Sequence, residues 1–424
     1  MKNQILILLA SFFAIQTQAQ TLTTIVPDIN DSRVITTGVP FMLIATDARA
    51  AAMGDMGVAT SVDAYSQQWN SSKYAFSETK QGFSVNYTPY LTKLVNDISL
   101  GYVTYYNRLS EKSAFAASFK YFSLGEIELL YSEQDIPRIA KPNELTIDVS
   151  YALKLSEQFA MSVAMRFLRS DLKIDAINPD ASAASTFGVD ISGYYQSEEE
   201  AYNSFNGRTR LGFAIQNIGP KFEYEDGGIP NFQPTTLRLG GGFDFILDDY
   251  NTVAVTAEVT KLLVPTPPVT GTLREFNDNN GNGVFDPENG TDNTDTDTLG
   301  APANPENSTV IIDGKSRDVG FFKGMFQSFG DAPGGFSEEI KEFTWALGAE
   351  YRYQESFAFR AGYFNEAEEK GARKYFAIGA GFKYNVVGID LSYLFSASKV
   401  QNPLENTLRF SLTFNIGSGT YTEY

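Results

Sequence analysis

Long runs in which apolar and polar residues alternate constrain this chain more than any other feature of its sequence. Between Glu144 and Leu155, six apolar residues alternate with polar or small ones. Similar alternation returns, in places more weakly, between Gly82 and Ile416, and we count about fourteen stretches of roughly 9–13 residues. A period of two gives a β-strand one apolar face and one polar face. The chain is therefore predicted to be all-β.

Strand length and connection length favour a membrane barrel over a secreted β-sandwich. Soluble strands typically have about 5–6 residues, whereas a tilted strand that crosses a bilayer needs about 9–11. The faces opposite the apolar ones hold small or charged residues such as Gly379 and Lys383, as a polar lumen would. Tight turns such as Asn385–Val386 alternate with longer connections. We therefore predict a transmembrane antiparallel β-barrel of about 14 strands over residues 81–424.

The composition excludes several classes of chemistry. The chain has no Cys and no His, which excludes disulfides, Ser-His-Asp triads and Cys or His nucleophiles, and argues against zinc and haem sites. Its formal net charge is −18, whereas nucleic-acid binding favours Lys and Arg. We therefore predict no catalytic residues, no required cofactor and no nucleic-acid partner, and expect that the protein is not an enzyme.

Residues 1–19 match a secretory signal peptide. Lys2 precedes an apolar run from Ile5 to Ile15, and Thr17 and Ala19 supply small residues before a cleavage site. The run is shorter than the roughly 20 residues of a transmembrane helix. A buried N-terminal helix is the alternative interpretation. Export together with the barrel pattern predicts the outer membrane of a Gram-negative-type envelope, with its lipid around the barrel.

Residues 20–80, which precede the first predicted strand, show helical signals. Asp47 is placed to cap an Ala-rich helix that ends at Gly54, and a second short helix is predicted over Asp63–Trp69. This segment is too small for a core of its own, so it is either a periplasmic tail or a plug that supplies partners to charged residues in the lumen. The predicted plug residues are Asp47, Arg49, Trp69 and Asn70.

The connection at residues 264–340 is far longer than ordinary loops and carries 13 acidic and 4 basic residues. Its second half is rich in large apolar residues, several of them at helical spacing. This face either packs on the loop and the barrel mouth or binds a partner. The predicted partner-binding residues are Phe321, Phe322, Met325, Phe326, Phe329 and Phe336.

The first half of this loop contains an oxygen-rich pattern. Alternate positions match part of a calcium-binding loop, although Asn289 stands where a bidentate Glu is usual. A solvated acidic turn is the alternative, so Ca²⁺ within residues 278–289 is a possible ligand and not a required one. The predicted metal ligands are Asp278, Asn280, Asn282, Val284 and Asp286.

Two strings of residues resemble a known family. The stretch from Asp47 to Thr60, continued from Ser66 to Phe76, closely resembles the N-terminal signature of the PorV family of outer-membrane type IX secretion system proteins. The string from Phe326 to Glu339 is also similar to that family. More remotely, the family is similar to the FadL-like barrel superfamily of fatty-acid transporters. The resemblance covers essentially the whole chain after the signal peptide.

The resemblance implies a cargo shuttle. Members of the family bind the C-terminal signal domain of cargo that leaves the type IX translocon barrel, and pass the cargo to a sortase-like attachment complex. The competing hypothesis is a FadL-like transporter that moves hydrophobic solutes through the lumen. The length and charge of the loop at 264–340 favour the shuttle.

Overall fold

Strand β7 (Asn143–Lys154) shows how the barrel sorts its side chains. Thr146, Asp148 and Ser150 are buried, whereas Ile147 and Val149 between them are exposed. A soluble sheet buries its apolar face, so this inverted order indicates a wall with lipid outside and a polar interior.

The structure is a computed structural model that describes residues 22–28, 32–91, 95, 97–129, 138–173, 182–225, 227–278, 285, 297–302, 308–398, 404–405 and 407–418. The predicted signal peptide lies outside these residues.

Fourteen antiparallel strands of the described chain close into a ring, which confirms the predicted barrel. The first strand pairs with the last, so that Phe83 lies opposite Phe414. In chain order the strands are β2 (Thr79–Pro89), β3 (Ile98–Arg108), β4 (Ser113–Leu124), β7, β8 (Phe159–Asp171), β9 (Ala184–Gln196), β11 (Asn206–Ile218), β12 (Thr236–Ile246), β13 (Asn251–Leu262), β17 (Phe343–Tyr353), β18 (Phe357–Asn365), β19 (Lys374–Tyr384), β20 (Val387–Ser396) and β21 (Leu408–Ser418).

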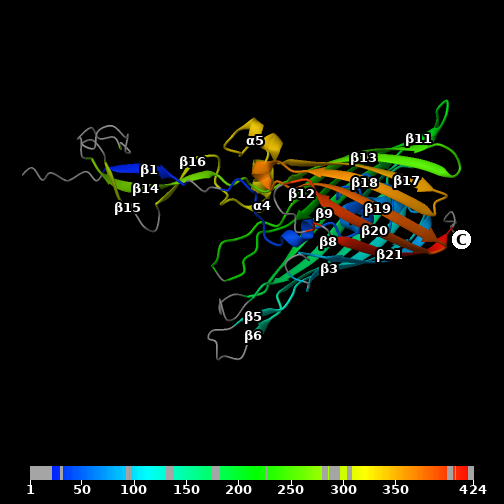
Figure 1. Cartoon of the computed structure of the whole chain (residues 1–424), viewed down its shortest axis with the longest axis horizontal. Coiled ribbons are helices and arrows are strands. Elements are labelled where there is room, and N and C mark those ends of the chain that lie inside the picture. Colours follow the sequence, from blue (N-terminus) through cyan, green and yellow to red (C-terminus); the bar gives the residue numbers. More distant parts are fainter. Residues whose placement is uncertain are drawn as a thin grey trace, which may run out of the picture. The chain divides into compact units, whose positions relative to one another are not determined.

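The two ends of the barrel differ in their connections (Figure 1). One end, which we call the turn end, carries tight turns such as 354–356 and 385–386, with one longer turn at 197–205. The other, which we call the loop end, carries the connections 90–97, 125–142, 172–183, 219–235, 263–342, 366–373 and 397–407. Short elements in the loop-end connections include β5 (Ile127–Leu129), β6 (Arg138–Ala140), α4 (Phe321–Gln327), α5 (Phe336–Lys341) and η3 (Glu368–Lys370). At the turn end, β10 (Glu200–Ala201) lies in the longer turn 197–205.

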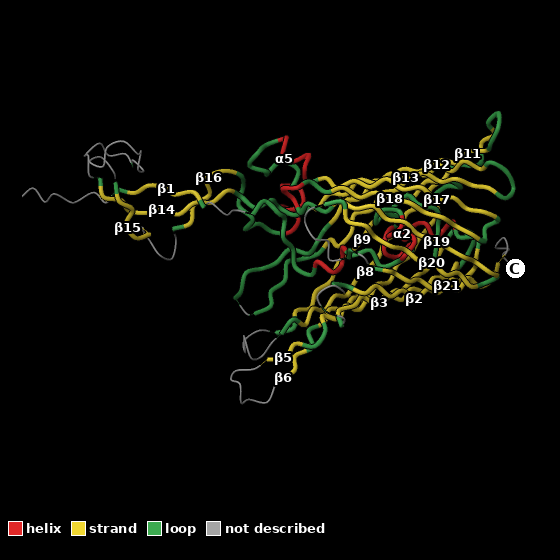
Figure 2. The backbone as a smooth tube through the Cα atoms, viewed as in Figure 1, coloured by secondary structure: helices red, strands yellow, loops and turns green. Residues whose placement is uncertain are grey.

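The described residues from 32 to 78 pass through the lumen from the loop end to the turn end. At the loop end, Val39 and Phe41 pack in one apolar cluster with Phe122. At the turn end, Arg108 donates to the Ser77 carbonyl at 2.6 Å. Figure 2 shows α2 among the strands between these points. The short helices of this segment are η1 (Pro40–Leu43), α2 (Ala48–Ala52), α3 (Ser66–Trp69) and η2 (Ser71–Phe76).

The local signals of this segment hold in the structure. The Asp47 carboxylate accepts the Ala50 N–H at 2.7 Å, as an N-cap should. Gly54 follows α2 with φ of 87°, a left-handed conformation that suits glycine. The second helix begins at Ser66, three residues later than predicted.

A second compact unit is built from two distant segments. Strand β1 (Thr23–Pro27) pairs with one edge of β14 (Val269–Asn277). The opposite edge of β14 pairs with β15 (Thr298–Pro302) and β16 (Thr309–Asp313). The sequence prediction kept residues 23–27 in one segment with the rest of 20–80, as a tail or a plug, whereas the structure pairs them with the long loop.

Among the described residues, no helix has the length and apolar character needed to cross a bilayer.

We expect Val149→Arg to destabilise the barrel by about 2–4 kcal/mol, because it places a charge on the outer face midway along β7. Leu155→Arg, in the turn after β7, should cost only about 0–1 kcal/mol. Urea unfolding of both variants in lipid vesicles measures the difference. Equal losses would contradict a lipid-facing position for Val149.

Candidate functional site

A buried cluster of charged side chains at the loop end holds the segment that carries α4 and α5. Lys261, near the end of β13, donates to Glu342 at 2.5 Å and to Glu339 at 3.3 Å. Lys370, between β18 and β19, donates to Glu342 at 3.0 Å and to Glu338 at 2.6 Å. These bonds attach α5 to the wall and to a neighbouring connection.

The N-terminal end of the lumen segment also reaches this cluster. Arg33 donates to Glu338 at 2.8 Å and to the Pro267 carbonyl at 2.5 Å. Burial opposes ionisation of Glu338, but hydrogen bonds from Lys370, the Gly334 N–H and Arg33 outweigh it and lower the pKa of Glu338 to about 2. The carboxylate is therefore ionised at neutral pH and available to both cations.

Carboxylates also connect α5 to the turn that precedes it. Glu339 accepts the N–H groups of Asp331 and Ala332 at 2.8 and 2.9 Å. Asp331 in turn accepts the Thr266 N–H at 3.2 Å. The segment from 321 to 342 is thus fixed to the loop end by polar bonds.

This scaffold leaves large apolar side chains exposed. Phe322, Phe326, Phe329 and Phe336 have exposed fractions of 60%, 76%, 51% and 80%, and we call these four residues the aromatic surface. Clusters of exposed apolar side chains often mark interaction sites. The arrangement is therefore suited to binding another protein.

Two of the six predicted partner-binding residues lie differently. Met325 is buried, with an exposed fraction of 9%. It follows Gly324, whose backbone lies close to the Phe232 ring. Phe321 is half-buried, and its ring centroid lies 4.3 Å from that of Phe322. Helical spacing alone predicted one shared face, whereas Met325 packs inward.

The four predicted plug residues are buried in the lumen segment. Asp47 accepts the indole N–H of Trp69 at 2.8 Å, which joins α2 to α3. Arg49 donates twice to Glu350 of β17, at 2.9 Å each. Asn70 donates to the Gly193 carbonyl of β9, also at 2.9 Å. Arg49 and Asn70 thus attach the segment to different strands of the wall.

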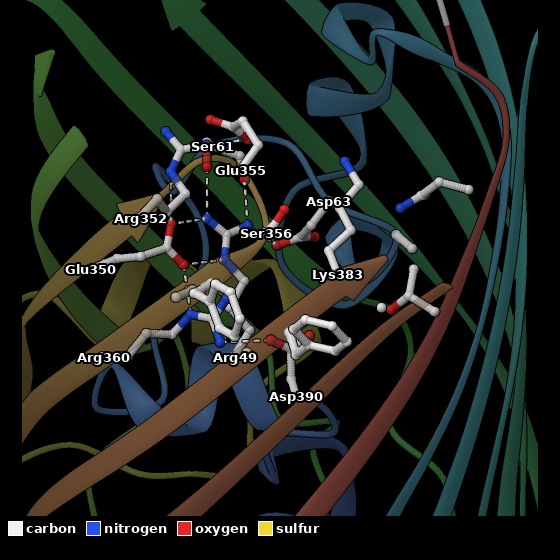
Figure 3. A pocket seen from close by; sticks show the side chains of 18 of the residues that line it. Arg49, Ser61, Asp63, Glu350, Arg352, Glu355, Ser356, Arg360, Lys383 and Asp390 are labelled. Atoms are coloured by element: carbon white, nitrogen blue, oxygen red, sulfur yellow. Dashed lines mark hydrogen bonds and ion pairs between the residues drawn. The ribbon is translucent and has the colours of Figure 1, made fainter. Parts of the chain in front are cut away.

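A cavity of about 170 Å³ lies between the lumen segment and strands β17–β21 (Figure 3). Eight of its twenty lining residues are charged, and most of these pair with one another. Glu350, already paired with Arg49, also accepts from Arg360 at 2.5 Å, and Arg360 donates to Asp390 at 2.6 Å. The ion pairs of this cavity hold the segment in place.

Sequence reasoning missed the charged cluster at the loop end. One signal was present, because Lys261 continues the outer-face series Val255, Ala257 and Val259 of β13, where a charge is out of place unless it has partners. The identity of those partners depends on how the long loop folds back.

Most of the predicted calcium ligands lie outside the described residues. Of the five, Asn280, Asn282, Val284 and Asp286 lie outside the described residues, and Asp278 lies within them. In the part of the chain that the structure describes, no group of three or more acidic residues is arranged to hold a metal ion.

Comparison with known proteins gives one family and a set of barrel structures. A family model described as type IX secretion system protein PorV matches residues 28–269, more than half of the chain. No curated protein matches the chain.

The similar solved structures are distant. The toluene transporter TbuX of Ralstonia pickettii has 13% identity and a TM-score of 0.43, and the match covers 88% of this chain and 97% of that one. The toluene transporter TodX of Pseudomonas putida has 11% identity and a TM-score of 0.45, with 90% and 98% covered. A FadL homologue of Pseudomonas aeruginosa has 12% identity and a TM-score of 0.42, with 91% and 100% covered.

Arg49→Ala should loosen the lumen segment, because it leaves buried carboxylates with fewer partners. Removing one member of a buried ion pair typically costs about 3–5 kcal/mol. The chain has no native Cys, so Ala51→Cys in α2 gives a single thiol whose labelling rate reports opening. We expect labelling to accelerate by at least about 100-fold.

The matched control is Arg208→Ala, which breaks the more exposed pair with Glu199 at 2.5 Å. Such pairs contribute about 0–1 kcal/mol, so labelling should change little. Equal rates in the two variants would show that Arg49 does not hold the segment.

The contribution of Glu338 to the fold should depend on acidity. Its pKa falls from 4.5 to about 2 on folding, so this contribution is complete above pH 4.5 and is lost as the pH falls toward 2. We expect pepsin to cleave the 321–342 segment increasingly across this range. Glu338→Gln should be cleaved readily already at pH 4.5, whereas Glu355→Gln, with a 68% exposed side chain, should behave like the unaltered protein.

Proposed function

The chain belongs to the PorV family of type IX secretion system proteins, and from this membership we propose that it binds the C-terminal signal domain of secreted cargo. It is an outer-membrane β-barrel with a role in type IX secretion. Barrels of this membrane have short periplasmic turns and longer external loops. The loop end, with α4 and α5, therefore faces the outside, where exported cargo emerges.

The aromatic surface is the observation that supports this proposal. It exposes four phenylalanines in the connection 263–342, at the end of the barrel that carries the longer loops. The charged cluster beneath it keeps the backbone in place, so a partner would bind a preformed surface. A cargo receptor needs such an external protein-binding surface, and a solute transporter does not.

The filled lumen also favours a receptor over a FadL-like transporter. The segment from 32 to 78 bonds to the wall from several sides, including Gly57 N–H to Glu258 at 2.8 Å and Asp55 to Arg409 at 3.0 Å. A transported solute would have to displace these buried contacts. We propose that this segment is a plug and that cargo is handled outside the barrel.

The remaining steps of the proposal follow from the family. We propose that the protein receives cargo at the type IX translocon barrel and delivers it to the sortase-like attachment complex. Its own role is binding and carrying, with no catalytic step and no nucleic-acid partner. Outer-membrane lipid surrounds the strands throughout.

Phe326→Asp and Phe336→Asp should each weaken binding of a purified cargo C-terminal domain to the full-length protein in lipid nanodiscs. Loss of a central aromatic contact typically costs about 2 kcal/mol, which corresponds to roughly 30-fold in Kd. Ile229→Asp is the control, because Ile229 is 87% exposed in a different connection of the loop end. Unchanged affinity in both Phe variants would overturn the assignment of this surface.

A further inference from the structure

The first residues of the lumen segment lie against the part of the chain that carries the aromatic surface. Arg33 donates to Glu338 of α5 from two nitrogens, Nε at 3.1 Å and Nη2 at 2.8 Å, and its Nη1 donates to the Pro267 carbonyl at 2.5 Å. Arg317, which precedes α4, donates to the Thr36 carbonyl at 2.8 Å. The start of the lumen segment is thus bonded both to α5 and to the chain just before α4.

The connection 219–235 gives α4 an indirect contact with the same segment. The Gly38 N–H donates to the Phe232 carbonyl at 2.9 Å. A side chain added at Gly324 of α4 would lie 2.8 Å from the Phe232 ring, so the backbone of α4 packs directly on this ring. Both helices that present the phenylalanines therefore rest in part on residues 33–38.

Arg33 also balances the charge of the buried cluster that holds α5. The cluster pairs three carboxylates with three cations, and its members are Glu338, Glu339, Glu342, Lys261, Lys370 and Arg33. Of the three cations, Arg33 alone comes from the lumen segment, and its side chain is 20% exposed. Withdrawal of the segment would leave three carboxylates with two cations, and an uncompensated buried charge is costly.

This dependence has a thermodynamic consequence for any partner of the aromatic surface. Without Arg33, α5 loses one of its attachments, so the phenylalanines are held in place less well. A partner therefore binds more tightly when the segment is in the lumen than when the segment is withdrawn. Linkage then requires that the bound partner stabilise the inserted segment by the same factor.

We propose that Arg33 is a positioning residue that couples partner binding at the aromatic surface to insertion of the lumen segment. While the segment fills the barrel, the surface is presented, and a bound partner keeps the barrel filled. A receptor built in this way does not open its lumen while it carries cargo. The identity of the partner rests on the proposed function, whereas the coupling itself can be tested without cargo.

The first test uses the full-length protein in lipid nanodiscs without cargo. Arg49→Ala and Asn70→Ala each remove a bond between the lumen segment and the wall, to β17 and β9 respectively. Both bonds lie in the half of the barrel nearer the turn end, whereas α4 and α5 lie at the loop end. The thiol of Ala51→Cys reports withdrawal of the segment, and protease reports the order of residues 321–342. Cleavage of 321–342 should accelerate at least about fivefold in both variants.

Fast labelling with unchanged cleavage would show that the segment moves independently of the aromatic surface, and the coupling would be overturned. Arg208→Ala, the labelling control, should change neither rate. Arg33→Ala should accelerate cleavage by itself, and adding Arg49→Ala to it should accelerate cleavage no further, because the link is already broken. Further acceleration in the double variant would overturn the role of Arg33.

The second test adds a purified cargo C-terminal domain at saturating concentration. Labelling of Ala51→Cys should slow at least about fivefold in the otherwise unaltered protein. Arg33→Ala should raise Kd at least about fivefold and abolish the slowing, and Arg33→Lys, which keeps the charge, should show smaller changes in both. Lys370→Ala is the matched control, because it removes a cation from the same carboxylates but not from the lumen segment. It should weaken binding while the slowing remains.

The outcomes separate this inference from the proposed function. If the unaltered protein does not bind the cargo domain, the proposed function fails, and the cleavage experiment still decides the coupling. If cargo binds and labelling does not slow, the proposed function stands and the coupling is overturned. Equal slowing of labelling by cargo in Arg33→Ala and Lys370→Ala would also overturn the proposal, since Arg33 would then not be the link.

Discussion

The hydrogen bonding of the backbone in lipid is the constraint on which the rest of this structure depends. No water reaches the N–H and C=O groups of a strand inside the hydrocarbon layer, so each must find a partner in a neighbouring strand. The ring meets this requirement only because β2 pairs with β21, which lies more than 300 residues away in sequence. Closure places apolar side chains outward and leaves a narrow, polar interior.

That interior creates a second requirement, which the lumen segment meets. Arginines and carboxylates that point inward need partners, because a buried unpaired charge is costly. In the segment, Arg49 donates to Glu350 and the Gly57 N–H donates to Glu258. Arg210 of the wall donates to the Ala59 carbonyl of the segment. The strands and the segment inside them therefore depend on each other, since the loss of either would leave charges unpaired.

Local patterns predicted much of this fold, and distant pairings escaped prediction. Period-two alternation identified the strands, and Asp47 with Gly54 marked the ends of α2, because both signals lie within a few residues. The bond between Arg49 and Glu350 joins positions 301 residues apart, and nothing in the neighbourhood of either residue specifies the other. The pairing of β1 with β14 escaped prediction for the same reason. Met325 was predicted to be exposed and is buried, because helical spacing groups residues on one face of a helix but does not say whether that face packs against the rest of the protein.

The loop end has the same order as the membrane wall, with charged groups buried and apolar side chains exposed, although longer loops extend beyond the bilayer. Lys261, Lys370 and the glutamates at 338, 339 and 342 are buried here, whereas the four phenylalanines of the aromatic surface are exposed. Burying ion pairs is seldom the cheapest route to stability, since apolar residues of similar size often serve as well or better. The arrangement makes sense if the apolar side chains are reserved for a partner and the charges hold the backbone that presents them. A surface fixed in this way loses little conformational entropy on binding, so more of the contact free energy appears as affinity.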